Sequence, residues 1–352
     1  MAATPSPASP LVVRFGALGD MVLMTPLLET LRRRYGQRCE LVSSGPGTLP
    51  LMGFVDAVSS TRILYSRRGP FLLNPDQWRL VRWLRGRPPG PVYVCETDDK
   101  THALLRLGGV DERWICTRRD FPLLPGEHYI KRYQRLAAAT PRAWTGPAPP
   151  AAGPAPPPRL QLTAAARQDC AQWLARRRLD GGPLVLVQPG NRRTMRWWAP
   201  AQRGSNIKWW PEERWAAVIR GVRAARPECR VLICGSPQES RLAHAILAQC
   251  GDGAFSVAGE LPIPRLLALQ ERAHSMISVD TGPAHSAAAL ACPLVVMYAT
   301  TYQASTYDFD WAPADTRTVA PPADGLDQPL LTLQPEQVLT AWRSLRARPP
   351  AP

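Results

Sequence analysis

The chain has 352 residues, 45% of them hydrophobic. This is more than one compact core usually needs, so two domains are expected. Its 43 Lys and Arg outnumber its 28 Asp and Glu, and the net charge of +15 favours an anionic partner such as nucleic acid, an acidic lipid surface or a phosphorylated substrate. Much of the excess is Arg dispersed among Pro and Ala, so a purely compositional origin of the charge stays open. The lack of any zinc-finger, basic-zipper or RNA-binding signature argues against nucleic acid.

The cysteines and the N-terminal residues bear on location. The eight cysteines form no Cys-x-x-Cys pair and no histidine cluster accompanies them, so buried thiols are expected and a metal site is not. The first ten residues carry no positive charge, and no apolar run approaches the ~18 residues of a membrane-spanning helix. We therefore expect a cytoplasmic protein, with peripheral attachment at the cytoplasmic face of an inner membrane left open.

Apolar strands and amphipathic helices alternate through the first part of the chain. The expected strands are 11–15, 39–43, 62–65, 91–95 and 113–116, and the expected helices are about 20–34, 46–53, 75–85, 101–107 and 128–138. Residues 145–158 are then almost entirely Pro, Ala and Gly, which cannot form a helix interior or a central strand. They predict an extended linker between an N-terminal domain, 1–144, and a C-terminal domain, 159–352.

The same alternation returns after the linker. The expected strands are 184–188, 230–234, 255–257, 275–279 and 294–298, and the expected helices are 163–177, 211–225, 237–249, 263–272 and 283–291. A final helix, 335–347, could dock on either domain. Alternation in both halves predicts an α/β fold with two parallel-sheet domains facing a cleft.

Two polar turns follow apolar strands, one in each half of the chain. One is Asp280-Thr281-Gly282-Pro283-Ala284-His285, and the other is Gly16-Ala17-Leu18-Gly19-Asp20. Such turns point backbone N–H groups and the positive end of a helix at an anion. At the carboxyl ends of two strands, they suggest a ligand held between two α/β units. Gly16 and Gly19 do not form G-x-G-x-x-G, so an NAD-dependent Rossmann enzyme is disfavoured.

The residues alone leave a structural alternative at each position. Asp20 and Asp280 can cap helices, and His285 can be a hydrogen-bonded helix histidine. Lys208 precedes a helix that starts near Pro211, where its charge can add to backbone donors on a diphosphate, although a lone lysine is usually exposed. A carboxylate at Glu239 also suits the start of its helix for structural reasons.

Three marks in the chain carry a resemblance to a known family. They are Arg14 to Asp20 running on to Thr25-Pro26, then Gln188-Pro189-Gly190 with 208–215, and finally Val279 to His285 through Pro293. Together they resemble glycosyltransferase family 9, whose best-known members are the ADP-heptose:lipopolysaccharide heptosyltransferases. The resemblance spans nearly the whole chain. It implies a GT-B fold of two Rossmann-like domains, acceptor side N-terminal and nucleotide-sugar side C-terminal, with inverting transfer that uses no metal and no cofactor.

The resemblance also implies a set of site residues. Asp20 resembles the general base of the family. Lys208 resembles a contact to the donor phosphates, Asp280 a contact to the donor sugar, and Glu239 an acidic contact to the ribose. Thr194 and Arg192 follow the strand 184–188 and would lie over the same phosphates. The expected donor-binding set is Lys208, Thr194, Arg192, Glu239, Asp280, Thr281, Gly282 and His285.

The acceptor side is less legible. Gly16 and Gly19 let the backbone turn tightly next to a substrate. Arg67, Arg68, Arg118 and Arg119 can meet phosphates of a lipid-linked acceptor or an anionic leaflet, and a solvated basic surface explains any single one of them as well. In the heptosyltransferases the acceptor is the inner core of lipopolysaccharide.

The expected function is transfer of heptose, or a related sugar, from an ADP-sugar to a lipopolysaccharide-type, lipid-linked acceptor. Residues 195–207 are longer and more aromatic than expected of ordinary heptosyltransferases, so a different nucleotide sugar stays open. Trp197 and Trp198 in this segment can stack on a sugar or base, or can fill a loop. A catalytically silent protein that binds a nucleotide sugar or glycan is the alternative from another class.

Overall fold

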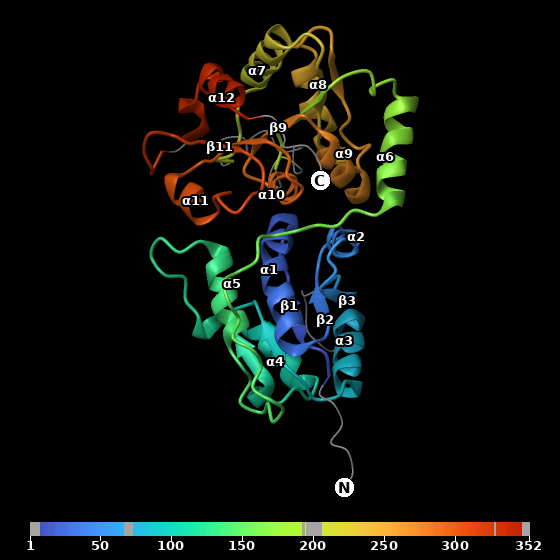
Figure 1. Ribbon diagram of the computed structural model, residues 1–352, viewed down its shortest axis with the longest axis vertical. Helices are drawn as coiled ribbons and strands as arrows, with labels where there is room; N and C mark the ends of the chain where they lie inside the picture. The colour runs from blue at the N-terminus through green and yellow to red at the C-terminus, as the bar shows by residue number, and fades with distance from the viewer. Residues whose placement is uncertain (1–7, 67–72, 192–193, 195–205, 327–328, 347–352) are drawn as a thin grey trace. The chain divides into compact units, whose positions relative to one another are not determined.

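The computed structural model describes residues 8–66, 73–191, 194, 206–326 and 329–346. The chain divides into two compact units, Met1–Gln161 and Leu162–Pro352. Each unit is a parallel sheet with helices packed on it, as the alternating pattern predicts (Figure 1). All eight cysteines are buried and none forms a disulfide, which confirms the expectation of buried thiols. Among the described residues, no helix is long and apolar enough to span a bilayer.

The N-terminal unit has a five-stranded sheet with the order β3-β2-β1-β4-β5. Its strands are β1 (Leu11–Arg14), β2 (Cys39–Ser43), β3 (Val58–Ile63), β4 (Val92–Val94) and β5 (Ile115–Thr117). The central strand β1 is buried along its whole length. The chain leaves β1 toward β2 and β3 and later returns to the other side of β1 with β4. The carboxyl ends of β1 and β4 therefore meet where the strand order reverses, which is where ligands bind in open α/β sheets.

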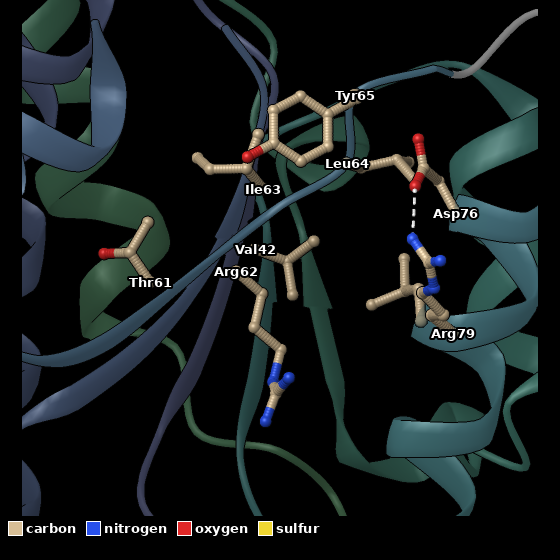
Figure 2. Close-up of a pocket in the computed structure, with 9 residues that line it drawn as sticks. Val42, Thr61, Arg62, Ile63, Leu64, Tyr65, Asp76 and Arg79 are labelled. Carbon is tan, nitrogen blue, oxygen red and sulfur yellow. Dashed lines mark hydrogen bonds and ion pairs between the residues drawn. The ribbon is translucent and has the colours of Figure 1, made fainter. Parts of the chain in front are cut away.

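The edge strand β3 is where the sequence-based expectation is wrong. The expected strand was 62–65, but the strand runs from Val58 to Ile63. Its side chains Ser59, Ser60 and Arg62 are exposed, so the strand lacks the apolar run on which the expectation depends. Beside it lies a hollow of about 260 Å³ that contains none of the predicted site residues. Figure 2 shows its lining, which is Val42, Thr61, Arg62, Ile63, Leu64, Tyr65, Asp76, Arg79 and Leu80.

Five α-helices cover the N-terminal sheet: α1 (Leu18–Tyr35), α2 (Thr48–Met52), α3 (Pro75–Gly86), α4 (Asp99–Leu107) and α5 (Tyr129–Ala138), counted over the described residues. Helix α1 packs along α5. Helix α3 begins after Asn74, whose side chain accepts a hydrogen bond from the N–H of Gln77. Its buried face packs on the sheet core through Leu80, Val81 and Leu84.

The Pro-rich segment 145–158 is hydrogen-bonded to the N-terminal unit. Arg34 of α1 donates a hydrogen bond to the carbonyl of Pro150, and Gln134 of α5 donates to the carbonyls of Ala152 and Gly153. Farther on, the N–H of Gln161 donates to the carbonyl of Phe54. The segment is extended, and these anchors account for the boundary of the first unit at Gln161.

The C-terminal unit has a six-stranded sheet with the order β11-β10-β9-β6-β7-β8. Its strands are β6 (Leu184–Gln188), β7 (Arg230–Ile233), β8 (Ala254–Ser256), β9 (Ser275–Val279), β10 (Leu294–Met297) and β11 (Thr316–Val319). The order reverses between β6 and β9, so their carboxyl ends form the second switch point. Strand β11 was not predicted from the sequence, because three of its four residues, Thr-Arg-Thr, are polar and it lies at the sheet edge.

The helices of this unit are α6 (Ala164–Arg176), α7 (Glu212–Ala225), α8 (Ser240–Leu247), α9 (Ile263–Arg272), α10 (Gly282–Ala289), α11 (Thr301–Thr306) and α12 (Pro335–Arg343). The short α11 was also missed. The last helix, α12, packs against α7, β10 and β11. Its Val338, Leu339 and Trp342 enter the core, and the Trp342 indole N–H donates to Ser275 Oγ at 2.9 Å. This helix therefore belongs to the C-terminal unit.

Candidate active site

Asp20 lies in the first turn of α1, directly after the carboxyl end of β1. Ala17 is the N-cap residue and Asp20 is the third residue of the helix. Its Oδ2 accepts a hydrogen bond from the N–H of Ala17 at 2.9 Å, and its Oδ1 accepts one from Arg14 Nη2 at 2.7 Å. The side chain is still 31% exposed. Asp20 thus stabilises the helix start, as the structural alternative predicts, and its carboxylate is still partly exposed to solvent.

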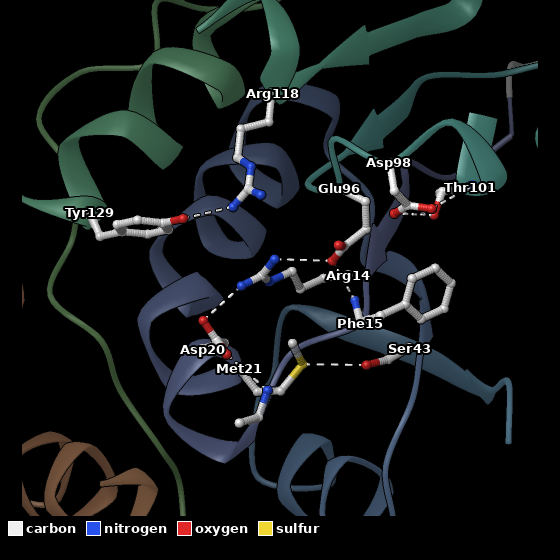
Figure 3. Close-up of polar contacts among 11 residues, drawn as sticks. Arg14, Phe15, Asp20, Met21, Ser43, Glu96, Asp98, Thr101, Arg118 and Tyr129 are labelled. Atoms are coloured by element: carbon white, nitrogen blue, oxygen red, sulfur yellow. Dashed lines mark hydrogen bonds and ion pairs between the residues drawn. The ribbon is translucent and has the colours of Figure 1, made fainter. Parts of the chain in front are cut away.

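Arg14 joins Asp20 to a second carboxylate that the sequence analysis did not identify. Its Nη1 donates to Glu96 Oε1 at 3.0 Å, and the same oxygen accepts from the N–H of Phe15 at 2.7 Å. The side chains of Arg14 and Glu96 are only 9% and 11% exposed. Figure 3 shows the three charged side chains meeting where β1 and β4 end. Arg14 ends the apolar strand β1, and Glu96 follows the apolar strand β4. A charged residue at such a buried position needs a partner of opposite charge, and this need could have indicated the pair from the sequence.

Gly16 lets the turn close on Asp20. A Cβ added at Gly16 would lie 2.5 Å from Asp20 Cβ and 3.0 Å from Met21 Cε. The first of these distances is shorter than real Cβ contacts, so a side chain at position 16 would force Asp20 to move. Gly19 is buried in the first turn of α1.

The two predicted acceptor-side arginines that the structure describes have different surroundings. Arg118 follows β5 and is 8% exposed; its Nη1 donates to the Tyr129 hydroxyl at 2.9 Å. Among the described residues, none accepts a hydrogen bond from its Nε. Arg119 instead holds the loop after β4, because it donates to the carbonyl of Thr97 and to Asp99. Arg67 and Arg68 lie outside the described residues.

In the C-terminal unit, Asp280 brings together Lys208 and His285. Asp280 ends β9 and is 8% exposed. Lys208 Nζ donates to the Asp280 carbonyl at 2.9 Å and to its Oδ2 at 2.5 Å. His285 Nε2 lies 3.5 Å from the other carboxylate oxygen, Oδ1. Lys208 and the turn 280–285, which were predicted from separate segments of the sequence, therefore form one cluster.

The charges of the cluster keep Asp280 ionised. Burial acts to raise the pKa of Asp280, but the hydrogen bond with His285 and the positive charge of Lys208 outweigh it and lower that pKa to about 2. His285 packs on the Phe309 ring at 4.9 Å between centroids. Its Nδ1 is buried, and no hydrogen-bond partner for it occurs in the described part of the chain.

The neighbouring turn places Thr281 and Gly282 at the start of α10. Thr281 is the N-cap residue, and its side chain makes no capping hydrogen bond. Gly282 is the first residue of the helix. Pro283 has no N–H, and the N–H groups of Ala284 and His285 donate to the Thr281 carbonyl. This helix end therefore offers the N–H of Gly282 and a partial positive charge beside Lys208.

Glu239 and Thr194 connect the loops that follow β6 and β7. Thr194 Oγ1 lies 2.7 Å from Glu239 Oε1, and Glu239 Oε2 accepts from the N–H of Ser236 at 2.7 Å. Glu239 is 6% exposed, and a Cβ added at Gly190 would lie 2.0 Å from its Oε1. Glu239 therefore stabilises the start of its helix through the N–H of Ser236, as the structural alternative predicts. Its contact with Thr194 joins it to the loop that follows β6, at the switch point. Arg192 and residues 195–205 lie outside the described residues.

Each switch point thus carries part of the predicted set: Asp20 in one unit, and Lys208, Asp280, His285, Thr194 and Glu239 in the other. Across the described ranges, no group of three or more His, Cys, Asp or Glu is placed to hold a metal ion. The cations at the second switch point are side chains and a helix end, which suit an anionic ligand such as a diphosphate.

Comparison with known proteins decides the family. The sequence profile of Glycosyltransferase family 9 (heptosyltransferase) matches residues 112–320, which is more than half of the chain. The chain belongs to glycosyltransferase family 9. This family 9 chain is also 31% identical to Lipopolysaccharide heptosyltransferase 3 of Escherichia coli over 139 residues. That alignment spans 37% of each protein, so the family 9 chain matches little more than a third of the length of this relative.

Solved structures confirm the fold of this family 9 chain. ADP-heptose lps heptosyltransferase II of E. coli matches with a TM-score of 0.73 at 19% identity, covering 96% of this chain and 98% of that one. A family 9 glycosyl transferase from Veillonella parvula matches with a TM-score of 0.74 at 17% identity, covering 97% and 98%. The E. coli heptosyltransferase WaaC solved with ADP matches with a TM-score of 0.64 at 17% identity, covering 95% and 98%. The fold is therefore GT-B, with two parallel-sheet α/β domains.

Proposed function

We propose that this chain transfers heptose from ADP-heptose to a hydroxyl of a lipid-linked, lipopolysaccharide-type acceptor, with inversion at the anomeric carbon and without a metal ion. Family membership supports glycosyl transfer, and the relatives named for ADP-heptose or solved with ADP support the donor. The observation that carries the proposal is the cluster of Lys208, Asp280 and His285 at the start of α10.

Lys208 is the proposed ligand of the donor diphosphate. A lysine ammonium has three N–H donors, and two hydrogen bonds to Asp280 fix its position. We assign the third donor to a phosphate oxygen, with the N–H of Gly282 and the positive end of α10 directed at the same diphosphate. These groups replace the positive charge that a metal ion supplies to a leaving phosphate in other enzymes. Asp280 and His285 are assigned to hydroxyls of the sugar, and Glu239 to the ribose.

Asp20 is the proposed general base. As the acceptor oxygen forms its bond to the anomeric carbon, the bond from that carbon to the β-phosphate oxygen breaks. The acceptor proton passes to the Asp20 carboxylate, and the electron pair of the broken bond leaves with ADP, where Lys208 stabilises the charge. One displacement on the face opposite the leaving group inverts the anomeric carbon. Arg14 and the N–H of Ala17 hold the carboxylate in one orientation for this step.

Arg118 is the proposed acceptor-side cation. It lies at the same sheet edge as Asp20, and its buried guanidinium suits a phosphate or carboxylate of the acceptor. Gly16 and Gly19 are proposed to let the backbone between β1 and α1 approach the acceptor closely. A lipid-linked acceptor places the reaction at the cytoplasmic face of a membrane.

Calorimetric titration with ADP, UDP, GDP and dTDP, with and without magnesium, tests the donor assignment. The proposal requires selective ADP binding that magnesium does not alter and that weakens in Lys208→Ala. Preference for another nucleotide would replace the donor and keep the transferase. If no nucleotide binds, a catalytically silent protein becomes the better account.

A further inference from the structure

Four large hydrophobic side chains are exposed near one corner of the N-terminal unit. Leu49, Tyr65, Leu73 and Trp78 are 52%, 77%, 79% and 48% exposed. We call them the apolar crest. Scattered exposed hydrophobics are ordinary, but these four lie in or next to two consecutive junctions, β2–α2 and β3–α3. Leu49 is in the first turn of α2, Tyr65 and Leu73 lie between β3 and α3, and Trp78 is in α3 close to its start. Because β2 and β3 are adjacent and parallel, both junctions lie at the same edge of the sheet, at its β3 side (Figure 1).

Helix α3 turns a basic face outward beside the crest. Its buried positions are Gln77, Leu80, Val81 and Leu84. The opposite face carries Trp78 with Arg79 and, one turn on, Arg82, and all three are exposed. Trp78 and Arg82 are spaced i, i+4 and therefore share a face. Because helix side chains lean toward the N-terminus, the Trp78 ring leans toward the sheet edge where the crest lies.

The hollow of Figure 2 continues this surface. It brings the exposed Arg62 of β3 and Arg79 of α3 to one concave region beneath Tyr65. The acidic residue in its lining is Asp76, which lies 3.4 Å from Arg79, and the Arg79 side chain remains 80% exposed. The surface therefore combines exposed apolar side chains with an excess of arginine.

We propose that the apolar crest and the arginines of β3 and α3 form a docking surface for an anionic phospholipid bilayer. Leucine and aromatic side chains enter the headgroup boundary, while arginines are attracted to acidic headgroups, and reversible attachment generally requires both. Charge complementarity favours a bilayer over a second copy of this chain, which carries a net charge of +15 and would bring like charges together.

The docking surface lies at the same edge of the sheet as the proposed base. All five strands of the sheet are parallel, so the crest junctions lie at the same edge as the β1–α1 turn that carries Asp20. A bilayer bound there would hold lipid-linked acceptors at the edge that carries the base. This purpose rests on the proposed function, whereas bilayer binding itself is measured without donor or acceptor.

Flotation of the full-length protein with vesicles tests the proposal. The vesicles are phosphatidylcholine alone, or phosphatidylcholine with phosphatidylglycerol. One variant, Leu73→Ser/Trp78→Ser, removes half of the crest. A second, Arg79→Gln/Arg82→Gln, removes two charges. The matched controls replace side chains exposed elsewhere: Leu124→Ser/Tyr302→Ser and Arg33→Gln/Arg226→Gln.

Wild-type protein and both controls should float with the anionic vesicles only. The crest variant should lose at least about tenfold in vesicle affinity, and the arginine variant roughly 25-fold, at about fivefold per arginine near an acidic surface. Added salt should weaken wild-type binding, because the attraction is screened.

Two results would overturn the proposal. One is that wild-type protein stays with the unbound fraction, or that the crest and arginine variants float as the controls do. The other is that these variants abolish a concentration-dependent dimer in sedimentation velocity while vesicle binding is unchanged, which would assign the surface to a second copy. ADP titration distinguishes failure of this proposal from failure of the proposed function. If wild-type protein binds vesicles but does not bind ADP, the donor site is wrong and the docking surface stands.

Discussion

The guanidinium of Arg14 lies 2.7 Å from Asp20 and 3.0 Å from Glu96, so one buried cation spans the switch point of the N-terminal sheet. Glu96 is fixed by this contact and by the N–H of Phe15. Asp20 is fixed by Arg14 and by its own helix start. The proposed base is therefore part of a pre-formed network, and we expect Arg14 to act as a positioning residue for Asp20.

Arg14→Met should separate positioning from binding. It leaves Glu96 buried without its cation, which typically costs about 3–5 kcal/mol of folding free energy. It also releases the Asp20 carboxylate from one of its two donors. We expect kcat to fall while the affinity for ADP is unchanged. The check combines urea unfolding, ADP titration and steady-state transfer.

The double variant Arg14→Met/Glu96→Gln is the matched control. Removing the negative charge of Glu96 should recover much of the lost stability, since no uncompensated buried charge remains, but activity should stay low. Full recovery of kcat in the double variant would show that Arg14 has only a structural role.

Gly16→Ala should impair catalysis without unfolding the protein. The added methyl group would lie 2.5 Å from Asp20 Cβ, so the carboxylate must move. Displacement of a catalytic group by about 1 Å can cost roughly 100-fold in rate. Gly86→Ala is a suitable control, because nothing lies within 4 Å of the added atom. Equal transfer rates in the two variants would contradict the requirement for glycine at position 16.

The depressed pKa of Asp280, about 2 against an ordinary value of 3.8, predicts a pH dependence of stability. The unfolded chain takes up this proton more readily than the folded one, so the stabilisation is complete above about pH 4 and is lost as the pH falls toward 2. The shift corresponds to about 2 kcal/mol.

Thermal unfolding of wild type and Asp280→Asn between pH 2 and pH 7 measures this contribution. The difference in stability should be constant in the upper part of the range and should shrink below about pH 4. A difference that is unchanged down to pH 2 would mean that Lys208 and His285 do not stabilise the Asp280 carboxylate.

A double-mutant cycle tests the docking of α12 on α7. A Cβ at Gly221 would lie 2.4 Å from Leu339 Cδ1, and Leu339 is 5% exposed. Leu339→Ala alone should cost about 2–5 kcal/mol through the cavity it leaves, and Gly221→Ala alone about 1–3 kcal/mol through overpacking. The double variant should be destabilised by less than the sum, because the new methyl fills part of the cavity. Additive values from denaturant unfolding would contradict the contact.

The sequence predicted the fold class and most strands, because the strands of both sheet centres are apolar runs bounded by turns. The prediction failed at two of the edge strands, β3 and β11. Strand β3 was misplaced, and β11 was missed, since half or more of their residues are polar and solvent covers one side. A local apolar pattern carries little signal where only one neighbouring strand contributes to burial.

The position of a side chain at a switch point could be predicted where the residue directly follows a strand, as Asp280 follows β9. Lys208 was identified separately from the turn that holds Asp280 and His285, and the structure brings the three side chains into contact. Glu96 was missed because its partner Arg14 is 82 residues away in sequence, and pairing at that distance depends on strand order.

The most direct test of the account compares wild type with Asp20→Asn in single-turnover transfer from ADP-heptose, beside calorimetric ADP binding, with chelator present. Asparagine keeps the size of the side chain but cannot take the acceptor proton. We expect wild type to transfer heptose at a rate that the chelator does not affect. Asp20→Asn should lose at least about 100-fold in rate with its ADP affinity unchanged. Transfer by Asp20→Asn at the wild-type rate would contradict the assignment of the base, and no transfer by wild type would contradict the proposed reaction.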